Sequence, residues 1–324
     1  MLTYIIRRLL YSSVVLLVAS FLIFSFVSLS GDPLAFLKMA PGASPATIEN
    51  ITKRKHLDEP IPIRYGYWLK DAVTDKFGTT TVGDREIWPD LQRVMGHTLQ
   101  LVFAAELLAI FLAIVIGVYS ALRQYSIFDY AATTFSFLGL ATPVFWLALM
   151  LQVLFVNIYL WFDLRIFYTA NLSGVDPGSG ISFLLDRAQH LALPILVLSV
   201  ASIATYSRYM RGAMLEVINS DYVRTARAKG LKERKVIMKH AFRNALIPLT
   251  TVIALNFGAL VGGVVVTETV FGLDGMGLYY ITALNAGDPY PVMAWLMIVS
   301  AAIIFFNLLA DIMYGILDPR IRHD

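Results

Sequence analysis

The chain has 324 residues, of which 57% are hydrophobic and 15% charged, whereas a soluble domain carries about a quarter charged residues. It contains no cysteine, which excludes disulfide frameworks and thiolate metal sites. The net charge of +3 is small, so the distribution of charge along the chain is the useful quantity.

Crossing the hydrocarbon core of a membrane takes roughly 20 apolar residues in a helix. Six stretches meet this requirement: 9–29, 99–122, 131–160, 190–210, 245–270 and 292–317. The third contains Pro143, which predicts a kink or tilt, and the fourth is expected to begin near Pro194. The sequence therefore predicts an all-α integral membrane protein with six transmembrane helices.

The first stretch follows Arg7 and Arg8, as the apolar part of a signal peptide would. Its apolar run is longer than the roughly 7–15 residues of such a segment, and no A-x-A site follows. We expect it to remain as an uncleaved membrane anchor.

Lysine and arginine are concentrated between the fourth and fifth spans, whereas the link between spans five and six, 271–291, has neither. The basic residues are Arg208, Arg211, Arg224, Arg227, Lys229, Lys232, Arg234, Lys235, Lys239 and Arg243. Cytoplasmic loops carry the excess of Lys and Arg. The basic loop and both termini are therefore predicted to be cytoplasmic.

The external connection, 31–98, is long and rich in proline, and it also carries aromatic residues such as Tyr65 and Trp68. Disordered segments are poor in aromatics, so we expect a partly folded cap. Short helices are predicted near 46–56 and 62–73. The alternative is a flexible tether.

The cytoplasmic connection, 211–244, has no apolar run long enough to span. Asp221 is expected to cap a helix that begins at Tyr222, and Gly230 to end it in a left-handed position. A second helix is predicted over 232–246. The residues alone leave two alternatives open: a projecting knob that meets a protein partner, or a basic loop on anionic lipid.

Motifs for enzymatic chemistry are missing from the sequence. There is no G-x-x-x-x-G-K-[ST] phosphate loop, no H-E-x-x-H, and no metal-ligand spacing among the five histidines. No catalytic residue, metal or cofactor is expected, and the chain is not expected to be an enzyme. Three carboxylates lie within the spans, Glu106, Glu268 and Asp311, and we expect structural or interfacial roles for them. Glu268 and Asp311 are expected to reach water easily.

The stretch from Asp221 to Pro248 resembles the cytoplasmic signature loop of permease subunits in ATP-binding-cassette (ABC) importers. Thr225-Ala226-Arg227 occupies the place of the family's E-A-A segment, Gly230 is its glycine, and Ile247-Pro248 closes the pattern. The family glutamate is missing, and the sequence D-Y-V-R-T-A-R-A-K-G-L is typical of the dipeptide, oligopeptide and nickel branch. Further segments, read as Y-I-I-R-R-L-L, G-D-P, T-P-V-F-W, E-T-V-F-G-L-D-G-M-G and L-D-P-R, resemble its B-type subunit.

The resemblance implies a type I ABC importer permease fold in a bacterial cytoplasmic (inner) membrane, and a peptide substrate. The implied partners are a homologous second permease, two cytoplasmic ATPase subunits, an extracytoplasmic substrate-binding protein and membrane lipid, but no nucleic acid. It favours the projecting knob, because a transporter without a nucleotide site must receive the work of ATP hydrolysis mechanically. The implied ATPase-coupling residues are Asp221, Tyr222, Arg224, Thr225, Ala226, Arg227, Ala228, Lys229, Gly230 and Leu231.

The chain is thus expected to divide into an N-terminal helix (1–30), an external region (31–98) and a core permease domain (99–324). We expect a translocation path lined by small and polar residues, including Asn157 and Asn256. Two other functions stay open: a permease for nickel or another small chelate, and, in a different class, a stand-alone channel or secondary transporter. A membrane-embedded enzyme lacks a catalytic constellation.

Overall fold

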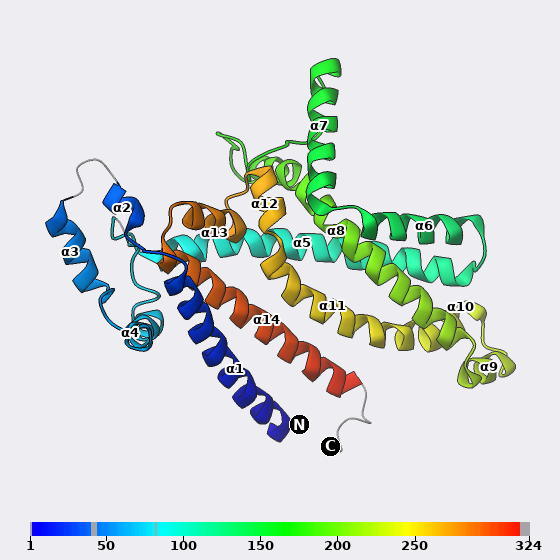
Figure 1. Cartoon of the computed structure of the whole chain (residues 1–324). Coiled ribbons are helices and arrows are strands. Elements are labelled where there is room, and N and C mark those ends of the chain that lie inside the picture. The colour runs from blue at the N-terminus through cyan, green and yellow to red at the C-terminus, as the bar shows by residue number, and fades with distance from the viewer. Residues whose placement is uncertain (1, 40–43, 82, 318–324) are drawn as a thin grey trace. The chain divides into compact units, whose positions relative to one another are not determined.

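The computed structural model of the chain describes residues 2–39, 44–81 and 83–317, and helices dominate these ranges (Figure 1). In chain order they are α1 (Leu2–Leu29), α2 (Ala35–Met39), α3 (Pro45–Arg54), α4 (Ile61–Thr74), α5 (Ile87–Leu122), α6 (Ile127–Ala141), α7 (Val144–Phe162), α8 (Ile181–Ile218), α9 (Asp221–Ala228), α10 (Glu233–Lys235), the π-helix η1 (Val236–Phe242), α11 (Arg243–Gly263), α12 (Val265–Phe271), α13 (Met276–Asn285) and α14 (Pro289–Leu317). The prediction of an all-α protein is confirmed.

Five helices in the described part of the chain are long and apolar enough to cross a membrane. They are Ile6–Leu29, Ile87–Leu122, Val144–Phe162, Ile181–Ile218 and Pro289–Ile312. They correspond to the first, second, third, fourth and sixth expected spans. The fifth expected span, 245–270, is divided between α11 and α12 and is not among these five.

The two predictions about proline have opposite outcomes. The expected kink at Pro143 is a complete break: α6 ends at Ala141, Thr142 is extended, and α7 begins at Val144. Proline forces the residue before it out of the helical conformation, which explains this break. Pro194, by contrast, lies well inside α8, which begins at Ile181, so the predicted helix start was wrong. Neighbouring helices compensate for such prolines in membrane helices.

The chain forms two compact units, of which the first comprises residues 1–99 and 274–304. In this unit α4 packs on α1, where Trp68 is buried with Phe24 and Met293. The Tyr65 hydroxyl lies 2.7 Å from the Ser20 hydroxyl on α1. The helices expected near 46–56 and 62–73 are confirmed as α3 and α4. The described part of the external segment is therefore ordered, which excludes a fully flexible tether.

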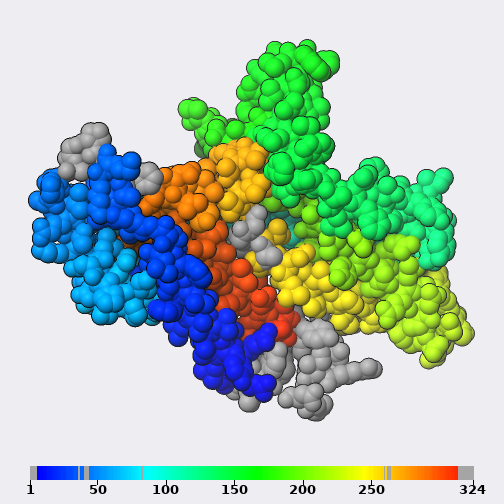
Figure 2. All heavy atoms as spheres, in the orientation of Figure 1, coloured from blue at the N-terminus to red at the C-terminus, as the bar shows by residue number. Residues whose placement is uncertain are grey.

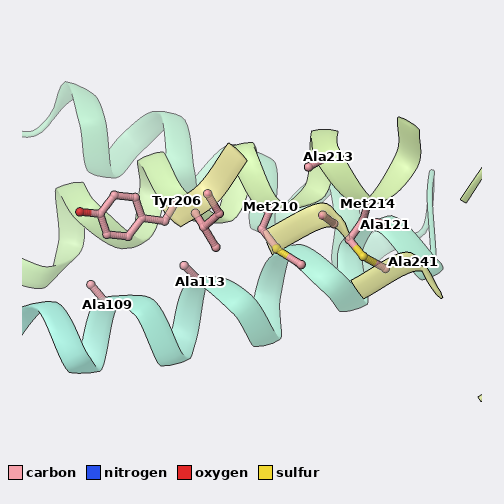
Figure 3. Packing of buried hydrophobic residues seen from close by; sticks show 10 residues of the cluster. Ala109, Ala113, Ala121, Tyr206, Met210, Ala213, Met214 and Ala241 are labelled. Atoms are coloured by element: carbon pink, nitrogen blue, oxygen red, sulfur yellow. The ribbon is translucent and has the colours of Figure 1, made fainter. Parts of the chain in front are cut away.

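The second unit comprises residues 100–273 and 305–324, and its core lies between α5, α8, η1 and α11. Figure 3 shows Ala113 of α5 facing Tyr206 and Met210 of α8. A Cβ atom at Gly117 on α5 would lie 2.7 Å from the Met210 Cβ atom, which is too close for any other residue. Small residues on α5 thus let α8 approach closely, as is common between membrane helices.

Candidate functional site

The short helix α9 follows α8 after a sharp turn, in the basic loop of the second unit (Figure 1). Ser220 holds the N-cap position in an extended conformation, and its carbonyl accepts the N–H groups of Val223 and Arg224. Its hydroxyl does not cap the helix but donates to the Val217 carbonyl at 2.6 Å. The predicted cap at Asp221 was therefore wrong by one residue. Asp221 is the first helical residue, where its negative charge complements the helix dipole.

The helix ends as the sequence predicts, at a glycine in the left-handed conformation. Gly230 has φ of +74° and donates its N–H to the Arg227 carbonyl at 2.9 Å. The N–H of Leu231 reaches back to the Ala226 carbonyl at 3.4 Å. These two hydrogen bonds form a Schellman motif, which satisfies the last carbonyls of a helix. The position and conformation of the turn are confirmed.

One face of α9 holds the helix against the rest of the loop. Val223 and Ala226 are buried together with Val236 of η1, and Leu231 and Val217 pack against them. Ala226, one of the predicted coupling residues, lies on this inner face because its spacing of three places it beside Val223, and its coupling role stays a prediction. The outer face presents exposed side chains, and Figure 2 shows this loop in yellow-green at the surface. The exposed predicted coupling residues are Asp221, Tyr222, Arg224, Thr225, Arg227, Ala228, Lys229 and Gly230.

An ion pair closes the loop between α9 and α10. The Arg227 guanidinium donates to Glu233, with Nη2 2.8 Å from Oε1, and its Nη1 also reaches the Ile218 carbonyl at 3.4 Å. The hydrogen bond from Arg227 holds the pKa of the Glu233 carboxyl below its usual value and raises the pKa of Arg227. Both side chains are exposed to solvent, so the pair positions α9 more than it stabilises the fold.

The segment after α9 differs from the single helix predicted over 232–246. A short α10 passes into the π-helix η1, which continues without a break into α11. Pro248 does not end the helix but lies inside α11. The Asn244 side chain donates to the Tyr222 hydroxyl at 3.2 Å and so ties α11 to α9. Wide π turns are often found at functional sites, and no residue pattern in the sequence revealed this one.

The two asparagines of the predicted path lie in different surroundings. Asn157 on α7 donates to the Val153 carbonyl of its own helix at 2.9 Å. Asn256 on α11 approaches the Tyr206 hydroxyl. That hydroxyl donates to Glu106 at 3.0 Å, and Ser202 donates to the other carboxylate oxygen at 3.1 Å. The structure does not bring the two asparagines together, and their lining of the path stays a prediction.

Sequence reasoning did not find this polar cluster around Glu106, which is 2% exposed and links α5 to α8. A carboxylate in the middle of an apolar helix was the available signal. The expectation that Glu268 reaches water easily was wrong, because it is 1% exposed on α12. Within the described residues, no three His, Cys, Asp or Glu side chains gather as metal ligands would.

Comparisons with known proteins give matches to two family descriptions. Residues 113–323 match the family described as "Binding-protein-dependent transport system inner membrane component", and residues 1–88 match the N-terminal part described for the same systems. The chain belongs to this family. It is therefore a multi-pass transport component of the inner membrane, and membership implies partner ATPase and substrate-binding proteins.

Relatives match this family member along its whole length. It is 40% identical to the oligopeptide transport system permease protein AppB of Bacillus subtilis, covering 100% of both chains. It is 39% identical to the oligopeptide permease OppB of Mycobacterium bovis over 98% of each chain, and 36% identical to the dipeptide permease DppB of Alkalihalophilus pseudofirmus over 100% of each. The resemblance seen in the residues of the signature loop is confirmed.

Proposed function

We propose that this chain is the permease subunit of an ATP-driven importer that moves dipeptides or oligopeptides across the cytoplasmic membrane. The observation that carries the proposal is α9, a helix ended by the Gly230 turn, with a charged, exposed outer face, in a chain that matches oligopeptide and dipeptide permeases throughout. The sequence has no phosphate-binding loop, so ATP hydrolysis takes place on a separate subunit.

In this proposal α9 docks in a groove of the ATPase. Its inner face is fixed by Val223 and Ala226, its ends by the turns at Ser220 and Gly230, and its flank by the Arg227–Glu233 pair. A helix held in this way moves as a body and transmits a push instead of deforming. Arg224 and Lys229 on the outer face pair with acidic groups of the ATPase.

The complete importer contains a homologous second permease, two ATPase subunits and an external substrate-binding protein. The ordered external segment is the docking platform for the binding protein, because α4 is packed against α1 by buried aromatic residues. Peptide passes along a route lined by small and polar side chains of α7, α8 and α11, including Asn157 and Asn256. The route has no ion-coupling site.

Uptake by the assembled transporter tests this function. The chain is purified from its native membrane with whatever subunits remain attached, reconstituted into liposomes and supplied with a binding protein and labelled di- and oligopeptides. We expect ATPase subunits in the preparation, and peptide uptake that requires ATP and survives a protonophore. Uptake that needs a proton gradient at constant ATP contradicts the importer mechanism. Uptake of nickel chelates without peptide uptake contradicts the substrate class.

A further inference from the structure

An ion pair with a buried carboxylate joins α6 to α8 in the second unit, away from the exposed face of α9. The Arg211 guanidinium donates two hydrogen bonds to the Asp129 carboxylate, from Nε to Oδ1 at 2.6 Å and from Nη2 to Oδ2 at 2.8 Å. The Asp129 side chain is 3% exposed and that of Arg211 is 27% exposed. Two-pronged contacts of this kind fix both the distance and the orientation of the helices that carry them.

The remaining hydrogen-bonding capacity of Asp129 is also used. The Ser120 hydroxyl at the end of α5 donates to Oδ1 at 2.7 Å, and the Tyr125 backbone N–H donates to Oδ2 at 2.9 Å. Tyr125 has φ of +64°, the left-handed conformation that directs this N–H toward the carboxylate. The Asp129 side chain thus joins three helices, α5, α6 and α8, at one point.

Two neighbouring contacts of α6 with α8 are close and involve no charged side chain. The Ser136 and Ser207 hydroxyl oxygens lie 3.2 Å apart, and a Cβ atom on Gly139 would lie 3.1 Å from the Val200 Cγ1 atom. Small residues of this kind allow close packing but do not by themselves prevent sliding. Among the described residues of α6, Asp129 is the one that forms a salt bridge with α8.

The pair also lies on the route from the coupling loop. Arg211 is on the last turns of α8 beside the buried residues Met210 and Met214, and α9 follows α8 directly. Force applied to α9 therefore reaches Arg211 along one continuous helix. On the other side, α6 leads through the break at Pro143 to α7.

We propose that the Asp129–Arg211 pair is the joint that makes α6 follow α8 when the ATPase displaces α9. Asp129 and Arg211 are positioning residues: they touch neither peptide nor nucleotide, and they convert displacement of the coupling helix into movement of the α6–α7 arm. The inference rests on the proposed function. Loss of the Asp129–Arg211 pair uncouples the transporter. ATP is still hydrolysed in response to loaded binding protein, but less peptide is transported for each ATP.

The measurement is peptide transported per ATP hydrolysed, in proteoliposomes with the complete complex. Asp129→Asn and Arg211→Gln keep most of the volume of each side chain but remove one charge. We expect this ratio to fall by about tenfold or more, within the range of coupling between two sites, because α8 can then move without carrying α6. ATPase stimulation by loaded binding protein is expected to persist. The control is Arg208→Gln, which removes a positive charge one turn away on α8, where the guanidinium lies 4.7 Å from the Phe137 ring centroid. Its ratio should stay at the wild-type value.

A covalent replacement of the joint separates positioning from folding. The chain has no cysteine, so Ser136→Cys with Ser207→Cys creates one defined pair between α6 and α8. In the Asp129→Asn background, oxidation should restore the transport ratio and reduction should abolish it again. With Asp129 intact, the oxidised pair should transport normally, because α6 and α8 move together. Loss of transport on oxidation of this double-cysteine variant with Asp129 intact would contradict the proposal.

Two further results overturn the inference. One is a wild-type transport ratio in both single variants. The other is a parallel loss of transport and stimulated ATPase activity that follows the amount of assembled complex, which indicates a purely structural pair. If the single variants do not assemble, Arg211→Lys takes their place, because it keeps the positive charge but cannot make the two-pronged contact. A wild-type ratio of peptide transported per ATP in Arg211→Lys contradicts the proposal. Failure of the wild-type complex to take up peptide refutes the proposed function instead.

Discussion

Replacing Gly230 tests whether the turn after α9 matters through its backbone. The left-handed conformation, φ of +74°, costs a residue with a Cβ atom about 1–2 kcal/mol. Among the described residues, its two chain neighbours aside, no atom lies within 4 Å of a Cβ atom at this position, so a small side chain adds no overlap within the loop. The expected cost of Gly230→Ala is therefore the backbone cost alone.

A cost of 1–2 kcal/mol lowers an equilibrium population by a factor of roughly 5–30. When only the native turn presents α9 correctly, the apparent dissociation constant for the ATPase rises by up to that factor. We expect the order Gly, Asn, Ala, Val from tightest to weakest binding, because asparagine tolerates the left-handed conformation and valine is β-branched.

The assay is titration of purified ATPase onto the permease in nanodiscs, with membrane insertion of each variant as the control. Binding of Gly230→Ala at the wild-type level would refute the role of the turn. Equal losses in Gly230→Asn and Gly230→Val would refute the backbone explanation and indicate a steric contact with the partner.

Three further predictions concern the loop, the topology and the external segment. Arg227 lowers the pKa of Glu233, so their ion pair stabilises the loop fully at pH values above the usual Glu pKa of 4.5. This stabilisation is lost as the pH falls through the lower pKa of the folded state. ATPase binding should therefore weaken in acid, and Arg227→Gln should remove that pH dependence. A cysteine at Ser44 should react with an impermeant thiol reagent in intact cells, and one at Ser220 should not; the reverse pattern contradicts the orientation. Deleting residues 41–70 should weaken docking of the binding protein, measured by pull-down, and leave the ATPases attached; undiminished docking contradicts the platform.

Local signals explain most of what the sequence predicted correctly. Gly230 ends α9 because glycine adopts the left-handed conformation without a steric penalty, and Pro143 breaks the third span because proline restricts its predecessor. The apolar runs located the membrane helices because the hydrocarbon core fixes their minimum length. Each of these signals is contained within a few residues or one helix.

The features that were missed depend on contacts between distant residues. Arg211 and Asp129 lie 82 residues apart in the sequence, with α7 between the helices that carry them, and nothing near either residue identifies its partner. Glu106 meets Ser202 and Tyr206 only because α5 and α8 pack together. The π-helix η1, which the sequence did not predict, likewise packs against α8 and α9.

The central claim, that α9 is the element on which the ATPase acts, is tested most directly by cross-linking. Since the chain has no cysteine, Arg224→Cys places a single thiol on the exposed face of α9. With a short thiol-to-amine reagent, we expect Arg224→Cys to give a covalent product with the ATPase subunit, and Ser44→Cys in the external segment to give none. An assembled, transporting complex in which Arg224→Cys links to no ATPase subunit would contradict the account.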